Sequence, residues 1–168
     1  CNSGETVNFS VNSITIGSAP CASVITPLNL AGTSDVKADK VTNRLLALQL
    51  LDEDSDPSNG IKITSAAKTA LAGRSLDFGA APATFNTDLK AVLAAVGEPY
   101  KSRTVDDDRR LLAREHFEDT LASKTGAPVV DTVTQTSSTL GAVTASITRY
   151  TIQAADKFYV PYEGNNAA

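Results

Sequence analysis

Four acidic side chains crowd into five consecutive positions, 52–56, immediately before a turn-forming segment. Without a counter-ion, such carboxylates repel one another and raise each other's pKa values, so a folded chain that keeps them together is expected to supply a cation. Carboxylate and carbonyl oxygens are the ligands that Ca²⁺ prefers. We therefore predict a Ca²⁺ site in this stretch. Its candidate ligands are Asp52, Asp54, Asp56, Asn59 and Ile61.

The alternation of Asp52, Asp54 and Asp56 resembles the first, third and fifth ligand positions of an EF-hand loop. Asn59-Gly60 permits a sharp turn with positive φ, and Ile61 resembles the apolar anchor of such a loop. The match is partial, because three residues separate Asp56 from the glycine and no downstream Glu takes the bidentate position. The stretch is interpreted as a variant EF-hand-like or dockerin-like loop. The alternative is a solvated acidic turn, since Asp, Pro, Ser, Asn and Gly all favour turns.

The two cysteines, Cys1 and Cys21, are open to two interpretations. Cys1 precedes a short polar run, as in a mature bacterial lipoprotein whose N-terminal thiol carries a lipid. The alternative is a disulfide between Cys1 and Cys21, which an oxidising exterior permits. Either interpretation predicts a secreted protein or one on the outer-membrane surface of a bacterium, with membrane contact only through a lipid on Cys1.

Other short motifs give no support for catalysis. Ser65-Ala66-Ala67-Lys68 and Lys124-Thr125-Gly126 match two elements of serine β-lactamases, but the S-D-N element between them is missing, which favours a chance match. The single histidine, His116, lies between Glu115 and Phe117 and is interpreted as a helix histidine paired with a carboxylate. We therefore expect the protein not to be an enzyme.

A second acidic run, Asp106-Asp107-Asp108, is a further candidate for cation binding. It stands at an expected helix start, where the helix dipole favours acidic side chains, so a structural role is preferred. The net charge of −4 gives no electrostatic support for a nucleic-acid partner. No apolar run is long enough to span a bilayer.

Hydrophobic periodicity predicts an α+β fold, with a helical middle between N- and C-terminal β-strands. A length of 168 residues with 42% hydrophobic content fits a single domain with one core. We expect a strand over 7–16, with a bulge or short turn at Asn12-Ser13, and then a loop over 17–33. Expected helices begin at Ser34-Asp35, Thr64-Ser65, Thr87-Asp88 and Thr104. The predicted parts are 1–33, strand and loop; 34–126, helices; 127–162, strands; and 163–168, a flexible end.

Two stretches resemble a known group of proteins. Residues 45–63 read LLALQLLDEDSDPSNGIKI, and residues 156–166 read DKFYVPYEGNN. They are similar to the amino-terminal region of large bacterial surface lipoproteins, in which a leucine-rich helix and a calcium loop precede a catalytic β-propeller, sometimes of phytase-like esterase type. The resemblance stops where such an enzyme would begin, so it carries over no catalytic residue.

The scarcity of catalytic groups favours a calcium-binding structural protein on the cell surface. We expect it to self-assemble with copies of itself by strand addition, starting from the strand at 7–16, into a surface fibre or filament. The alternative is an accessory N-terminal domain of a secreted phytase-like esterase or phosphatase lipoprotein. A sugar- or peptide-binding protein is a third hypothesis, but an aromatic content of 5% offers little stacking surface for a sugar.

Overall fold

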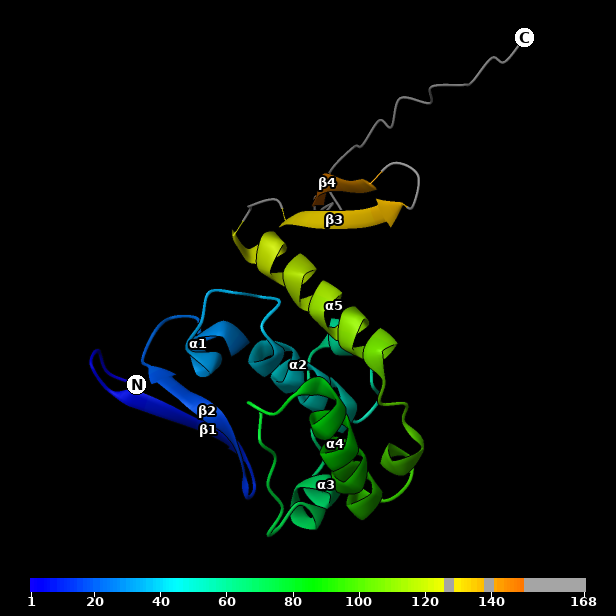
Figure 1. Ribbon diagram of the computed structural model, residues 1–168. Coiled ribbons are helices and arrows are strands. Elements are labelled where there is room, and N and C mark those ends of the chain that lie inside the picture. The colour runs from blue at the N-terminus through cyan, green and yellow to red at the C-terminus, as the bar shows by residue number, and fades with distance from the viewer. Residues whose placement is uncertain (126–128, 138–140, 150–168) are drawn as a thin grey trace. The chain divides into compact units, whose positions relative to one another are not determined.

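The computed structural model describes residues 1–125, 129–137 and 141–149, and the fold is α+β, as the periodicity predicts (Figure 1). The chain divides into two units, Cys1–Phe117 and Glu118–Ala168. The α-helices are α1 (Pro27–Ala31), α2 (Asp39–Leu51), α3 (Ser65–Ala70), α4 (Pro82–Val96) and α5 (Asp107–Thr125). The 3₁₀ helices are η1 (Pro57–Asn59) and η2 (Tyr100–Ser102). The strands are β1 (Thr6–Val11), β2 (Ile14–Pro20), β3 (Val129–Ser137) and β4 (Gly141–Arg149).

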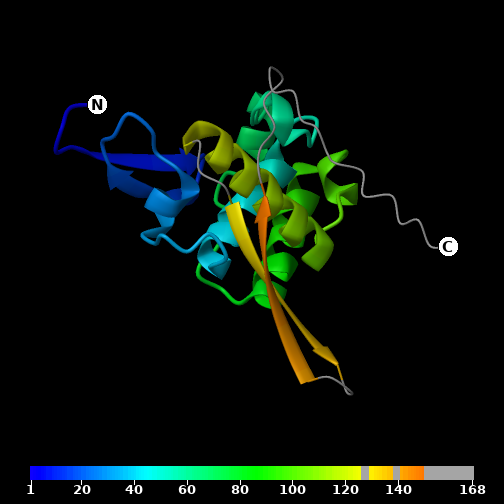
Figure 2. The same ribbon diagram turned by 90° about the horizontal axis from the view of Figure 1, so that it is seen from above.

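The N-terminal strands β1 and β2 form an antiparallel hairpin around a turn at Asn12-Ser13. Asn12 has a φ of 52°, a left-handed conformation that asparagine tolerates better than most residues. The register shifts between Phe9 and Ser10, so the irregularity in pairing lies inside β1. In both views the hairpin lies at one side of the helices α2 and α4 (Figure 1, Figure 2).

The segment 17–33, predicted as a loop, is more regular than expected. Strand β2 continues to Pro20, and α1 begins at Pro27, a residue whose fixed φ suits the first turn of a helix. At Gly17, where φ is 152°, a Cβ atom would lie 2.7 Å from the carbonyl oxygen of Leu30. The glycine therefore allows the helix to approach the strand, a constraint that periodicity does not reveal.

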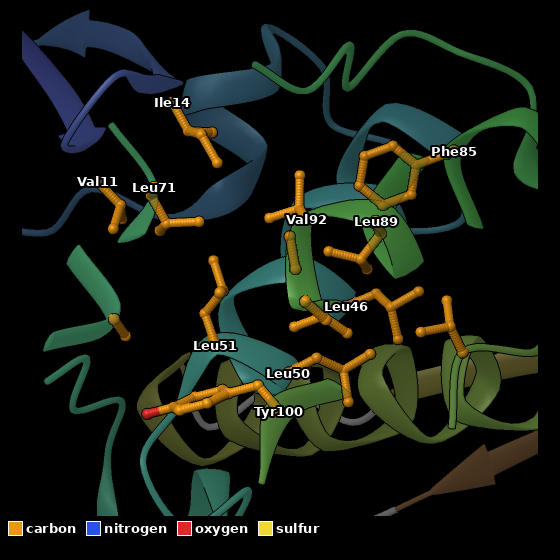
Figure 3. Packing of buried hydrophobic residues seen from close by; sticks show 14 of the residues in the cluster. Val11, Ile14, Leu46, Leu50, Leu51, Leu71, Phe85, Leu89, Val92 and Tyr100 are labelled. Atoms are coloured by element: carbon orange, nitrogen blue, oxygen red, sulfur yellow. The ribbon is translucent and has the colours of Figure 1, made fainter. Parts of the chain in front are cut away.

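The core of the first unit forms where the hairpin, α2, α3 and α4 meet (Figure 3). Helix α2 is buried on two sides: Leu46, Leu50 and Leu51 pack in this core, whereas Val41 and Leu45 pack with residues of α5 in a smaller cluster. The double burial explains why α2 is apolar over most of its circumference. The large side chains in the main core include Ile14, Leu46, Leu50, Leu51, Leu71, Phe85, Leu89, Leu93 and Tyr100.

Two predicted helix starts need correction. Helix α2 begins at Asp39 instead of Ser34-Asp35, and α4 begins at Pro82 instead of Thr87-Asp88. Proline at the first helical position lacks only a donor that would be unpaired anyway, so it starts a helix as well as a polar cap does. Near the expected start at Thr104, the structure begins α5 at Asp107, and Asp106 Oδ1 accepts a hydrogen bond from Arg109 N at 2.8 Å.

A buried polar network fixes α2 against α5 and the segment that leads into α4. Asn43 Nδ2 donates to the carbonyl oxygens of Phe78 and Ala80, each at 3.0 Å. Arg110 NH1 donates to Asn43 Oδ1 at 2.6 Å, and Arg110 NH2 pairs with Asp39 Oδ1 at 3.2 Å. Because both ends of Asn43 are bonded, its complete burial leaves no orphaned polar group.

In the second unit, β3 and β4 pair as an antiparallel hairpin, in register from Val129 opposite Arg149 to Ser137 opposite Gly141. Both strands fall within the predicted strand region 127–162. The remainder of that region, the stretch 156–166 and the predicted flexible end 163–168 lie outside the described residues. Among the helices that the structure describes, none is long and apolar enough to cross a membrane.

Candidate metal centre

The acidic loop begins where α2 ends and is closed at its base by main-chain contacts. Asp52 caps the C-terminus of α2 in an extended conformation. Glu53 N donates to the carbonyl oxygen of Lys62 at 2.8 Å, and Lys62 N donates to Asp52 Oδ1 at 2.6 Å. The Lys62 ammonium also pairs with Glu53 Oε2 at 2.5 Å. These contacts hold the two ends of the loop 52–62 together.

Arg103, about fifty positions further along the chain, fixes the end of α2. Its guanidinium donates to the carbonyl oxygens of Leu50 at 2.7 Å, Glu53 at 2.9 Å and Asp52. The last carbonyls of a helix have no partner inside the helix, so this fork satisfies groups that would otherwise need water. The Arg103 guanidinium carbon lies 4.2 Å from the centre of the Tyr100 ring, and burial lowers the Arg103 pKa.

Two of the loop carboxylates organise the loop itself. Asp54 Oδ1 accepts from Asp56 N at 3.0 Å, and Asp54 Oδ2 accepts from Asn59 Nδ2 at 2.8 Å. Asp56 Oδ1 accepts from Ser58 N at 3.0 Å and Ser58 Oγ at 2.6 Å, which makes Asp56 the cap of η1. Gly60 follows with a φ of 97° and ends this 3₁₀ turn, as the predicted Asn59-Gly60 turn requires.

Asp52 is the most buried of the acidic side chains in the loop, with 1% of its surface exposed. Its Oδ1 is satisfied by Lys62 N, but no hydrogen-bond donor among the described residues reaches Oδ2. The Oγ of Ser55, also buried, is likewise without a partner within the described part of the chain. A buried carboxylate oxygen with no donor is costly, so this oxygen is available to a cation or to water.

The carboxyl groups of Asp52 and Asp54 lie close to each other. The pKa of Asp54 is lowered to about 2, first by the hydrogen bond from Asn59, then by Asp56 N–H, and also by a side-chain hydrogen bond with Asp52. These hydrogen bonds favour the ionised form of Asp54, which is the form that can bind a cation.

The predicted ligands therefore fall into distinct environments. Asp52 is buried, Asp54 and Asp56 are exposed and hydrogen-bonded within the loop, and the side chain of Ile61 is 43% exposed. Within the described ranges, no group of three or more His, Cys, Asp or Glu side chains is placed to hold a metal ion. A cavity of about 360 Å³ adjoins the loop; its lining residues are Glu53, Asp54, Asn59, Gly60, Ile61 and Lys62.

Three contributors to this site were missed by the interpretation of the sequence. Arg103 is distant in the chain and belongs to no motif, so no local signal could have found it. Ser55 adopts a φ of 60°, which is unusual for serine and turns the chain inside the acidic run. Lys62 lies between Ile61 and Ile63, and this alternation is typical of any short extended segment. Only the fold shows that Lys62 N meets Asp52.

The other candidates occupy ordinary structural positions. Asp106 caps α5, and His116 lies on that helix. Ser65 and Lys68 are exposed on α3, and Lys124 lies in the last turn of α5, with Gly126 outside the described residues.

The structure joins Cys1 and Cys21 in a disulfide, with their Cα atoms 5.9 Å apart.

Comparisons of the chain with protein-family models, with curated proteins and with solved structures find no match.

Proposed function

We propose that this chain is a non-catalytic, calcium-binding structural protein of the cell exterior. The observation that carries the proposal is the buried Oδ2 of Asp52, which no described donor reaches and which lies in the same loop as a second carboxylate, that of Asp54. Hard oxygen ligands of this kind favour Ca²⁺ over softer metals. The EF-hand-like spacing of the loop supports the same ion.

In this proposal Ca²⁺ stiffens the connection between α2 and α3. The loop is already fixed at its base by Lys62 and at the helix end by Arg103, so it presents its oxygens with little further ordering. Bound Ca²⁺ removes the repulsion between the two carboxylates and ties residues 52–56 to the preceding helix. Because the ion binds only the folded form, it raises the free energy of unfolding.

The proposed setting on the cell exterior is supported by the disulfide between Cys1 and Cys21. A lipid on Cys1 would exclude this pairing. The intact mass of the native protein therefore discriminates between them: the disulfide predicts a loss of two protons relative to the reduced chain, whereas a lipid predicts a gain of several hundred daltons.

Self-assembly is proposed to use the free edge of β1. Among the strands that the structure describes, β1 pairs with β2 alone, so its outer edge offers unpaired main-chain groups. The strand sequence TVNFSV contains no charged residue or proline of the kind that protects exposed edges. We propose that a strand of another copy adds at this edge, and that repetition builds a surface filament.

The test of calcium binding uses the native chain, purified without chelator and then treated with EDTA. We expect elemental analysis to find one Ca²⁺ per chain and the melting temperature to fall after chelation. Returning CaCl₂ should restore the melting temperature. A chain that contains no calcium and melts identically in EDTA and in CaCl₂ would remove the basis of the proposal.

A further inference from the structure

Self-assembly through the outer edge of β1 requires a particular strand of the second copy as its partner. We propose that this partner is β4, which pairs antiparallel with β1 so that Glu5 of one copy lies directly opposite Arg149 of the next. The inference rests on the proposed self-assembly and names the edge of the second copy that β1 binds.

The hairpin that carries β1 is fixed at both of its ends. At the turn, Asn12 Nδ2 donates to the carbonyl oxygen of Lys68 in α3 at 2.8 Å. At the open end, the disulfide joins Cys1 to Cys21, and Cys21 N donates to the carbonyl oxygen of Glu5 at 2.8 Å. Because this edge is already ordered, the addition of a strand to it costs little conformational entropy.

The sheet of β3 and β4 lacks a third strand. In the part of the chain that the structure describes, each of these strands pairs only with the other. A two-stranded hairpin is marginally stable in water, and a further strand at one edge adds main-chain hydrogen bonds and neighbouring side chains. The two hairpins can therefore complete each other between copies.

The strand sequences favour β4 over β3 as the partner. Apolar residues alternate with polar ones in β1, at Val7, Phe9 and Val11. The same alternation occurs in β4, at Val143, Ala145 and Ile147. In β3 the corresponding series is interrupted by Asp131 and Gln135, and a charged residue within an edge strand protects that edge against pairing.

One antiparallel register matches the whole of β1 to β4. It places apolar residues opposite apolar ones: Val7 with Ile147, Phe9 with Ala145, and Val11 with Val143. It also places polar residues opposite polar ones: Thr6 with Thr148, Asn8 with Ser146, and Ser10 with Thr144. Such cross-strand matches are the main source of stability in a sheet.

The charged residues that flank these strands set the orientation. In the same register, Glu5, just before β1, lies opposite Arg149, the last residue of β4. Glu5 is exposed, and the hydrogen bond from Asn2 N to its Oε2, at 2.7 Å, lowers its pKa, so the carboxylate is ionised. Parallel pairing matches the apolar residues equally well but separates this charge pair. Charge complementarity therefore selects the antiparallel orientation.

The use of two different edges explains why assembly continues. Each copy binds one neighbour through β1 and another through β4, so the contact is heterologous and extends into a filament when its rotation does not close a ring. If β1 paired with β1 of a second copy instead, the contact would be isologous and would stop at a dimer.

A charge exchange in the full chain tests this pairing. The measured quantity is the lowest protein concentration that gives filaments, determined in CaCl₂ by ultracentrifugation and negative-stain electron microscopy. Glu5→Arg and Arg149→Glu each place like charges opposite each other and should raise this concentration about 2–30-fold, whereas the double variant should return to within about twofold of wild type. Asp88→Arg, the same charge change on the exposed face of α4, is the control and should have less than about a twofold effect.

A second comparison separates the two edges of the β3–β4 hairpin. Thr134 and Thr144 are direct partners in this hairpin, so Thr134→Lys and Thr144→Lys make the same change on neighbouring strands. We expect Thr144→Lys to raise the concentration needed for filaments by about tenfold or more, and Thr134→Lys by less than about threefold. Circular dichroism establishes that each variant is folded.

The outcomes distinguish this inference from the proposed function. If wild type forms filaments but the double charge exchange fails to restore assembly, or Thr134→Lys is as harmful as Thr144→Lys, the assignment of β4 is wrong while self-assembly stands. Growth that stops at a dimer would likewise overturn the pairing of β1 with β4. A wild-type chain that remains monomeric at high concentration in CaCl₂ would overturn both the inference and the proposed self-assembly.

Discussion

Replacing Asp52 by Asn should stabilise the calcium-free protein and remove most of the stabilisation that calcium gives. In the calcium-free protein the buried Oδ2 of Asp52 has no described donor, and an unsatisfied buried acceptor costs about 1–3 kcal/mol. Asparagine keeps an oxygen for Lys62 N and replaces the charged Oδ2 by a neutral amide, which can donate to the Asp54 carboxylate with which Asp52 interacts. Without calcium, Asp52→Asn is therefore expected to be more stable than wild type by about 1–3 kcal/mol.

Calcium should reduce or abolish this difference in the free energy of unfolding, because only the wild-type site binds the ion well. At a free Ca²⁺ concentration ten times the dissociation constant, binding adds about 1.4 kcal/mol to the wild-type free energy of unfolding. For a domain of this size each kcal/mol shifts the melting temperature by roughly 4 °C. We thus expect Asp52→Asn to melt about 4–12 °C above wild type in EDTA, and wild type to gain about 6 °C in calcium.

Thermal unfolding followed by circular dichroism, in EDTA and in CaCl₂, measures both effects. Asp88→Asn, a change of the same type at an exposed position on α4, is the matched control and should alter stability by less than about 0.5 kcal/mol in either buffer. If Asp52→Asn is less stable than wild type in EDTA, Asp52 Oδ2 is satisfied in the ion-free protein, and the reasoning from its missing partner is refuted.

Two further substitutions and one pH titration test other parts of the structure. Arg103→Lys keeps the positive charge but loses the fork on the end of α2, so it should cost about 1–2 kcal/mol in urea unfolding, and an unchanged midpoint would contradict this role. Asn43→Ala removes one acceptor of Arg110 and the donor to two carbonyl oxygens, and should cost about 2–4 kcal/mol; a cost below about 1 kcal/mol would mean that water replaces the amide. The pKa of Asp54, lowered from 3.8 to about 2, means that its stabilising hydrogen bonds are complete above pH 4 and are lost as the pH falls towards 2. NMR titration of the calcium-free chain should give a midpoint near 2, and a midpoint near 4 would show that these bonds do not form in solution.

The α+β class and the existence of the main helices could be predicted from apolar periodicity, because α2 and α4 bury the leucines that the pattern singled out. Helix starts were predicted less well. Pro82 begins α4 directly after Ala81, without the polar cap that the prediction relied on, and β2 continues through Gly17, where the strand was expected to have ended.

The candidate site was predictable only in part, for a physical reason. Local spacing reveals which side chains repel one another, and it therefore identified the stretch that holds Asp52 and Asp54. It does not reveal which carboxylate oxygens are satisfied by partners distant in the chain. Arg103 and Lys62 decide that Asp52 is fixed and buried, and local turn geometry directs Asp56 to Ser58.

Binding of Ca²⁺ by the loop can be measured residue by residue with ¹H–¹⁵N correlation NMR of the full chain during a CaCl₂ titration. We predict saturable shifts with one dissociation constant, concentrated in residues 52–62 and at the side chain of Arg103, together with a rise in the heteronuclear NOE of the loop amides. MgCl₂ at the same ionic strength provides the control for general charge screening. Shifts that remain linear up to 10 mM CaCl₂, or that are spread over all acidic surfaces including Asp106 and Asp88, would contradict a calcium site at this loop.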